Sequence, residues 1–86
     1  MFETDYSKVD PGLLEKVKGL EARLREASEN GRLTHGANCM LGVMLNVVYG
    51  LAQWAASGNA GKVARDRAEL GRSMERAARF LSENGY

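Results

Sequence analysis

The sequence has little of several residue types that carry chemistry: one cysteine, one histidine, one proline, two Phe, three Tyr and one Trp among 86 residues. The single cysteine, Cys39, excludes a disulfide within the chain, which favours a reducing compartment such as the cytoplasm. The N-terminus is acidic and is not followed by an apolar run, so it does not resemble a secretory signal. We therefore expect a cytoplasmic protein.

Catalytic signatures are also lacking. No strand is evident, so no glycine-rich phosphate loop can follow one, and the carboxylates alternate with basic residues along predicted helix faces. His35 and Cys39 stand four residues apart at the start of a predicted helix, where a thiol can be activated, but zinc needs three or four ligands. Only a homodimer could complete such a site with two residues from each copy. We predict no catalytic residues, no metal and no other cofactor, and hence a protein that is not an enzyme.

What the sequence has in quantity is helix-forming residues. Many Ala, Leu, Glu and Arg, with few β-branched residues, favour α-helix. The length suits one helical domain over residues 1–86, and a domain of this size often gains stability by pairing with another chain.

Three helices are expected, over residues 11–29, 35–56 and 60–82. Asp10 and Pro11 are typical of a helix start, Asn30 and Gly31 of a left-handed turn after a helix, and Thr34 of a second N-cap. Residues 57–61 have the composition of a turn. The pattern predicts an all-α, antiparallel three-helix bundle that forms a homodimer.

The central helix is unusual because no Lys, Arg, Asp or Glu lies between Arg32 and Lys62. We expect this helix to be buried on most of its sides. Its apolar surface exceeds what two neighbouring helices can cover, so a second copy or another partner is expected to cover the rest. Phe2, Tyr6 and Val9, spaced as one helical face, are an alternative cover. Length alone would also allow a membrane-inserted helix, against which stand its polar residues and its charged flanking helices.

The predicted interface is a stripe of small and polar residues on the central helix. Gly42 and Gly50 have the spacing that lets two helices approach closely, and Asn46 between them could pair across a two-fold axis. The full set of predicted interface residues is Gly42, Asn46, Tyr49, Gly50, Gln53 and Trp54.

A second predicted surface is a basic edge on the third helix. It consists of Arg65, Arg72, Arg76 and Arg79, with Glu69 among them. We predict a non-catalytic protein–protein interaction module, such as a small regulator, inhibitor or chaperone-like adaptor that binds another protein through its helix faces. The alternatives are binding of an anionic nucleotide or nucleic acid at the arginine edge, and membrane insertion of the central helix.

Overall fold

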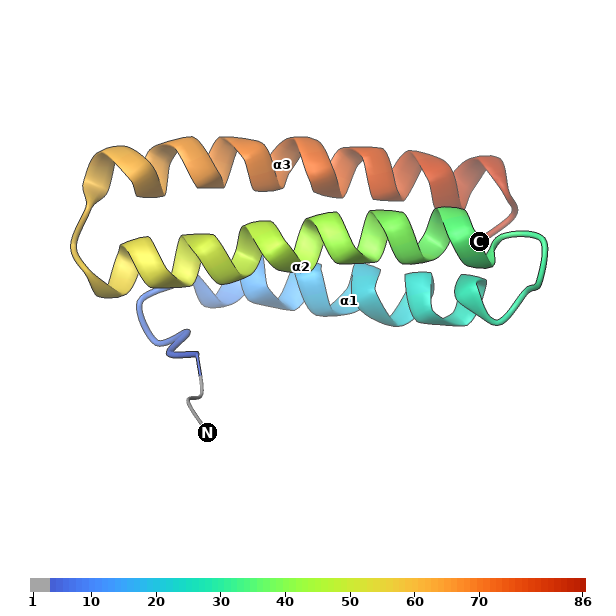
Figure 1. The fold of residues 1–86 in the computed structure, drawn as a ribbon, viewed down its shortest axis with the longest axis horizontal. Helices are drawn as coiled ribbons and strands as arrows, with labels where there is room; N and C mark the ends of the chain where they lie inside the picture. Colours follow the sequence, from blue (N-terminus) through green and yellow to red (C-terminus); the bar gives the residue numbers. More distant parts are fainter. Residues whose placement is uncertain (1–3) are drawn as a thin grey trace.

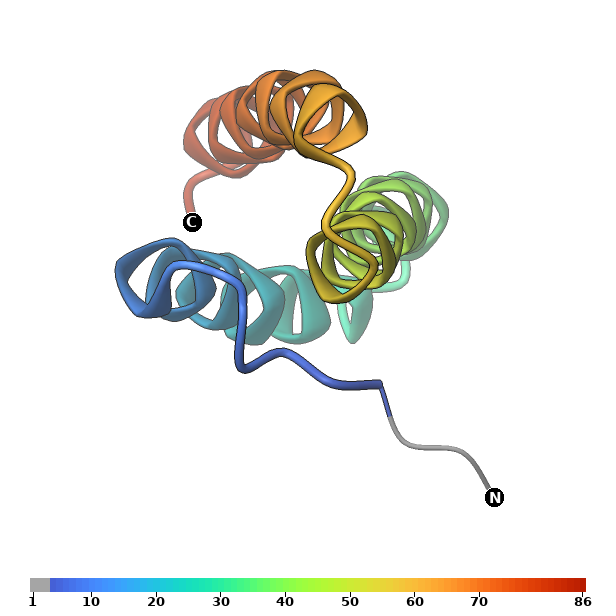
Figure 2. The same ribbon diagram turned by 90° about the vertical axis from the view of Figure 1, so that its left-hand side faces the viewer.

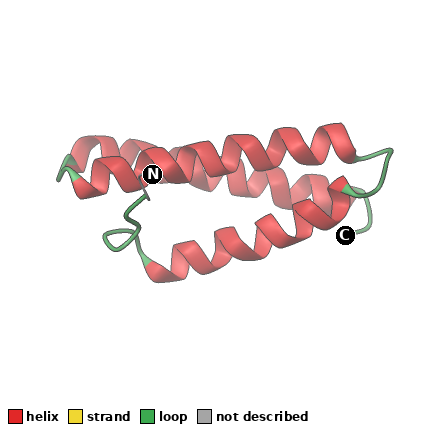
Figure 3. Ribbon diagram, turned by 60° about the horizontal axis from the view of Figure 1, so that its bottom comes forward, coloured by secondary structure: helices red, strands yellow, loops and turns green. Residues whose placement is uncertain are grey.

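A computed structural model of the chain describes residues 4–86, which form three α-helices and no strand (Figures 1 and 3). Helix α1 spans Pro11–Ser28, α2 spans Thr34–Ala56 and α3 spans Ala60–Glu83. The turn between α1 and α2 lies at one end of the bundle, and the turn between α2 and α3 lies at the other end (Figure 1). The all-α, three-helix class is confirmed, and every predicted helix end agrees with the structure to within one residue.

Two helices begin at a side chain that accepts a hydrogen bond from the first turn. Asp10 Oδ1 accepts from the Gly12 amide at 2.9 Å, with Pro11 as the first helical residue. Asn59 Oδ1 accepts from the Lys62 amide at 3.0 Å and does the same for α3. Such caps satisfy amides that have no partner within the helix.

The turn between α1 and α2 differs from the prediction. Gly31 does not have a positive φ, so the predicted left-handed turn at Asn30 and Gly31 is wrong; Gly58 and Gly85 are the two glycines with positive φ in residues 4–86. Thr34 is also not an N-cap. Its hydroxyl donates to the Ser28 carbonyl (2.7 Å) and the Asn30 carbonyl (3.0 Å), so it satisfies the end of α1 instead.

The core lies where the three helices meet. The largest fully buried side chains are Leu24, Met44, Leu51, Leu70 and Leu81. Helix α2 is not buried on most of its sides, contrary to the prediction, because α1 and α3 pack against one side of it and much of the other side is exposed. Its buried residues are Ala37, Leu41, Met44, Val48, Leu51 and Ala52, all from the face toward its neighbours.

The C-terminal end of the described chain lies against the bundle. The Tyr86 amide donates to the Leu81 carbonyl at 2.8 Å, and the Arg23 guanidinium donates to the Tyr86 carbonyl at 2.6 Å. The last residue therefore lies between α1 and α3 (Figure 2). At the other end Tyr6 and Val9 belong to a non-helical segment, so they do not form the predicted helical face. Phe2, the third member of that face, lies outside the described residues.

Helices α2 and α3 approach closely at Gly36. A Cβ atom at this position would lie 2.8 Å from Cε2 and 3.0 Å from Cζ of the Phe80 ring. Contacts shorter than ordinary van der Waals distance force the neighbouring side chain to move. Gly36 therefore gives the Phe80 ring the room it occupies beside α2.

We expect Gly36→Ala to lower the free energy of unfolding. Overpacking costs about 1–3 kcal/mol, and alanine recovers less than the ~1 kcal/mol it would gain in a helix interior, since Gly36 lies in the first turn. Urea denaturation measures the change. The double variant Gly36→Ala with Phe80→Leu should lose less than the two single variants added together; strict additivity would contradict the contact.

Candidate interaction surfaces

The first candidate surface is the solvent-facing side of α2, which we call the α2 face. Its exposed residues are His35, Asn38, Cys39, Gly42, Val43, Asn46, Tyr49, Gln53 and Ala56. Val43 is 47% exposed and Tyr49 is 50% exposed, the two largest exposures among the large hydrophobic residues of the described chain. Because α2 contains no Lys, Arg, Asp or Glu, an uncharged strip that includes two large apolar side chains runs between two charged helices.

The structure divides the six predicted interface residues between two sides of α2. Gly42, Asn46, Tyr49 and Gln53 belong to the α2 face. Gly50 and Trp54 point toward α3: a Cβ atom at Gly50 would lie 3.2 Å from Asp66 Oδ2, and Lys62 Nζ lies 4.7 Å from the centre of the Trp54 ring. The lysine over the ring is a cation–π contact, so Trp54 already has a partner within the chain.

Gly42 has no packing role within the described residues. A Cβ atom at this position would meet no atom within 4 Å, and the same holds for Gly71 near the middle of α3. A glycine in a helix interior costs about 1 kcal/mol relative to alanine. Contacts within residues 4–86 therefore do not explain the glycine at position 42.

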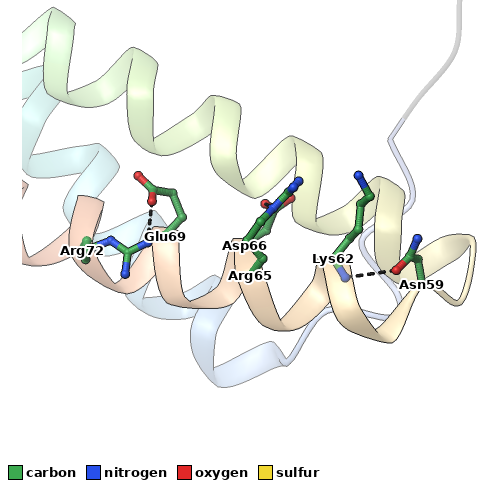
Figure 4. A network of polar contacts seen from close by, with 6 residues as sticks. All are labelled: Asn59, Lys62, Arg65, Asp66, Glu69 and Arg72. Atoms are coloured by element: carbon green, nitrogen blue, oxygen red, sulfur yellow. Dashed lines mark hydrogen bonds and ion pairs between the residues drawn. The ribbon is translucent and has the colours of Figure 1, made fainter.

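The second candidate surface is the basic edge of α3, which acidic side chains partly neutralise. Arg65 Nε lies 3.4 Å from Asp66 Oδ1, and Arg72 Nη2 lies 2.6 Å from Glu69 Oε2 (Figure 4). Within residues 4–86 the other two arginines of the edge, Arg76 and Arg79, form no ion pair. They line a shallow depression of about 170 Å³ together with Arg72 and Glu75. The free positive charge of the edge is thus concentrated in its second half.

The pKa of Glu69 is sensitive to the arginines of this edge. A hydrogen bond from Arg72 and the charges of Arg72 and Arg76 hold the pKa of the Glu69 carboxyl below its ordinary value. Because this pKa is lower in the folded state than in the unfolded state, the Arg72–Glu69 contact stabilises the fold at pH values above the unfolded-state pKa of Glu69. The stabilisation is lost as the pH falls through the folded-state pKa. Glu69 is solvent-accessible, so the effect on stability is small.

We expect Arg72→Gln to raise the pKa of Glu69 toward the ordinary value, because the variant removes the hydrogen-bonding cation and the larger of the two charges. Carboxyl chemical shifts followed by NMR between pH 2 and pH 7 measure it. Arg79→Gln, which removes a charge of the same edge, should leave the Glu69 titration nearly unchanged. An equal shift in both variants would show that overall charge, and not the Arg72 contact, sets this pKa.

A third region, between α1 and α3, was not predicted from the sequence. An open depression of about 430 Å³ lies there, and a second depression of the same volume lies near the α2–α3 turn. The first is lined by Lys16, Gly19, Leu20, Arg23, Met74, Glu75 and Ala78, and the second by Lys8, Ala55, Gly58, Ala60, Val63, Ala64 and Arg67. The sequence contains one signal for this region, a row of small residues on α3 that includes Ala64 and Ala78 and permits close helix approach.

His35 and Cys39 lie together at the start of α2, as their spacing predicts. The distance from Cys39 Sγ to His35 Nε2 is 3.7 Å, and both side chains are exposed. Residues 4–86 contain no group of three or more His, Cys, Asp or Glu side chains arranged to hold a metal ion. Further zinc ligands would therefore have to come from another molecule.

Helix α2 also meets the length and composition of a membrane-spanning helix. Its 18-residue apolar window has a mean hydropathy of 1.4, and 22% of that window is buried within the bundle. The core helix of a soluble protein passes the same test. Hydropathy therefore does not separate the membrane alternative from a helix that binds protein.

These features define a class: an all-α, three-helix bundle with one uncharged exposed helix face and one partly neutralised basic edge. No family model matches the chain, and no curated protein or solved structure shows significant similarity to it. The functional argument therefore depends on the chemistry of these surfaces alone.

Proposed function

We propose that this chain is a non-catalytic protein–protein interaction module, an antiparallel three-helix bundle that forms a homodimer through the α2 face. In this proposal it acts in the cytoplasm as a small regulator, inhibitor or adaptor. The observation that carries the proposal is the α2 face itself: Val43 and Tyr49 are about half exposed on a helix without a single charged residue.

The composition of the α2 face is that of an interface core. The buried centre of protein interfaces is depleted of charged residues and enriched in aromatic ones. Tyr49 supplies a large apolar ring with a polar tip, and Gly42 leaves room for a facing helix to approach closely. Asn46 lies between them and is exposed, so its amide is free to pair with the same residue of a second copy across a two-fold axis.

Sedimentation velocity at micromolar concentration tests the proposal. We expect the wild-type chain to be a dimer and Tyr49→Glu to be a monomer of unchanged helicity, because dimerisation would bury the new carboxylates. Ala68→Glu adds the same charge on the exposed outer side of α3 and should remain dimeric. A wild-type chain that stays monomeric, or a Tyr49→Glu variant with the wild-type mass, would contradict the proposal.

The second candidate function is binding of an anionic ligand or nucleic acid at the basic edge. It is supported by Arg76 and Arg79, which have no ion-pair partner within residues 4–86 and share one depression with Arg72. A fluorescein-labelled single-stranded oligonucleotide is the probe. Binding that falls steeply with salt and is lost in Arg76→Glu with Arg79→Glu supports this function; binding unaffected by the double variant rejects it.

A further inference from the structure

The side of the bundle between α1 and α3 has an apolar floor and small residues at its borders. Leu20 on α1 and Met74 on α3 are half-buried there, while Gly19 and Ala78 border the depression between them. Helices α1 and α3 contact each other less than either contacts α2. Small residues at these positions allow another backbone to approach closely.

The charges around this region have predominantly one sign. Lys16 and Arg23 border the depression from α1, and Glu75 is its one acidic residue. A separate depression near the α2–α3 turn is lined by Lys8 and Arg67 and by no acidic residue of the described chain. The hydrogen bond from Arg23 to the Tyr86 carbonyl holds that guanidinium at the border. The apolar floor is thus bordered by two basic side chains and one acidic one.

We propose that the groove between α1 and α3 binds an amphipathic helix of another protein, with acidic residues on both sides of its apolar face. Such a helix would occupy the fourth position of a four-helix bundle and cover Leu20 and Met74. Its acidic residues would meet Lys16 and Arg23, and this charge pattern selects the partner. The groove is separate from the α2 face, so the module has one surface for its own copy and one for a partner.

Nucleic acid fits this groove less well than a helix. Phosphates would match the basic border, but single-stranded binding also needs aromatic side chains for base stacking, and none lines the two depressions. Leu20 and Met74 would remain uncovered. A second copy fits less well because the exposed residues of its α2 face carry no negative charge.

The probe is a synthetic helical peptide with leucine and alanine on one face and glutamate on the other, compared with a peptide that has lysine at every glutamate position. Amide NMR shifts of the labelled protein report the site. We expect saturable shifts at Gly19, Leu20, Met74 and Ala78, and at least tenfold weaker binding of the lysine peptide at low salt. The difference should shrink as salt screens the border charges.

Matched variants test the site. Lys16→Glu with Arg23→Glu should weaken binding of the glutamate peptide at least tenfold. Lys18→Glu with Arg25→Glu makes the same change of charge on the same helix outside the groove and should leave the binding unchanged. Ala78→Leu, which occupies the depression without changing charge, should also weaken binding.

Three results with the peptides would each overturn the inference: equal binding of the two peptides, shifts confined to the α2 face, or no saturable binding. An oligonucleotide that binds the groove more tightly than the glutamate peptide would also overturn it. Tyr49→Glu should bind the glutamate peptide like the wild type. The proposal for the groove and the proposal for the α2 face can therefore be rejected independently of each other.

Discussion

Met44→Ala is expected to lower the free energy of unfolding by about 2–5 kcal/mol, the range for truncation of a buried methionine. Met44 is fully buried between the three helices. Val43→Ala, one residue earlier on the same helix, should change the stability of the monomer by less than about 0.5 kcal/mol, because nearly half of the Val43 side chain is exposed. Thermal and urea denaturation at low protein concentration compare the two.

The Met44→Ala and Val43→Ala variants also distinguish side chains that pack within the chain from side chains that pack between two chains. If the α2 face associates, Val43→Ala should weaken the dimer while leaving the monomer as stable as before. Two variants of equal stability in the monomer would contradict the orientation of α2, because adjacent positions of a helix cannot both be buried against the same two neighbours.

Gly42→Leu is expected to dissociate the dimer while helicity by circular dichroism stays high. In the proposed interface a leucine at this position forces the facing backbone away, which costs more than ordinary overpacking of about 1–3 kcal/mol. In an isolated monomer the same change should slightly stabilise the helix, since glycine costs about 1 kcal/mol in a helix interior and a Cβ atom here meets nothing within 4 Å. The dimer and the isolated monomer therefore predict opposite signs for the change in stability caused by Gly42→Leu.

Gly71→Leu is the matched control, because Gly71 also lies within a helix and has open space around it. It should be neutral or stabilising and should not change the solution mass. Gly50 does not offer the same test. A larger side chain there meets Asp66 of α3 within the chain, so its effect would mix two causes. A Gly42→Leu variant that is more stable than the wild type and has unchanged mass would remove the α2 face as an interface.

The helices could be predicted from the sequence because local chemistry sets their ends. Asp10 and Pro11 begin α1, and a Gly-Asn turn separates α2 from α3. The turn after α1 was predicted wrongly because Asn30 and Gly31 permit a left-handed conformation without requiring one. The Thr34 hydroxyl instead bonds back to the carbonyls of Ser28 and Asn30, a contact that depends on how the chain enters α2.

The surfaces were less predictable, because helical periodicity places residues on one face but does not say which neighbour covers it. Gly42 and Gly50 share the spacing of a close contact, yet only Gly50 lies beside α3. The groove between α1 and α3 could not be found in the same way. It depends on how far those two helices lie apart, which no spacing within one helix encodes.

The central position of α2 has a consequence for local unfolding. Helix α2 has more contact with each of its neighbours than they have with each other. Detaching α1 or α3 breaks one of the two larger sets of helix contacts together with the smallest set, whereas detaching α2 breaks the two largest. Amide hydrogens of α2 should therefore exchange most slowly with solvent, and those of the outer helices sooner. The helix that presents the α2 face is thus the last to open, so this face stays folded through partial opening of the bundle.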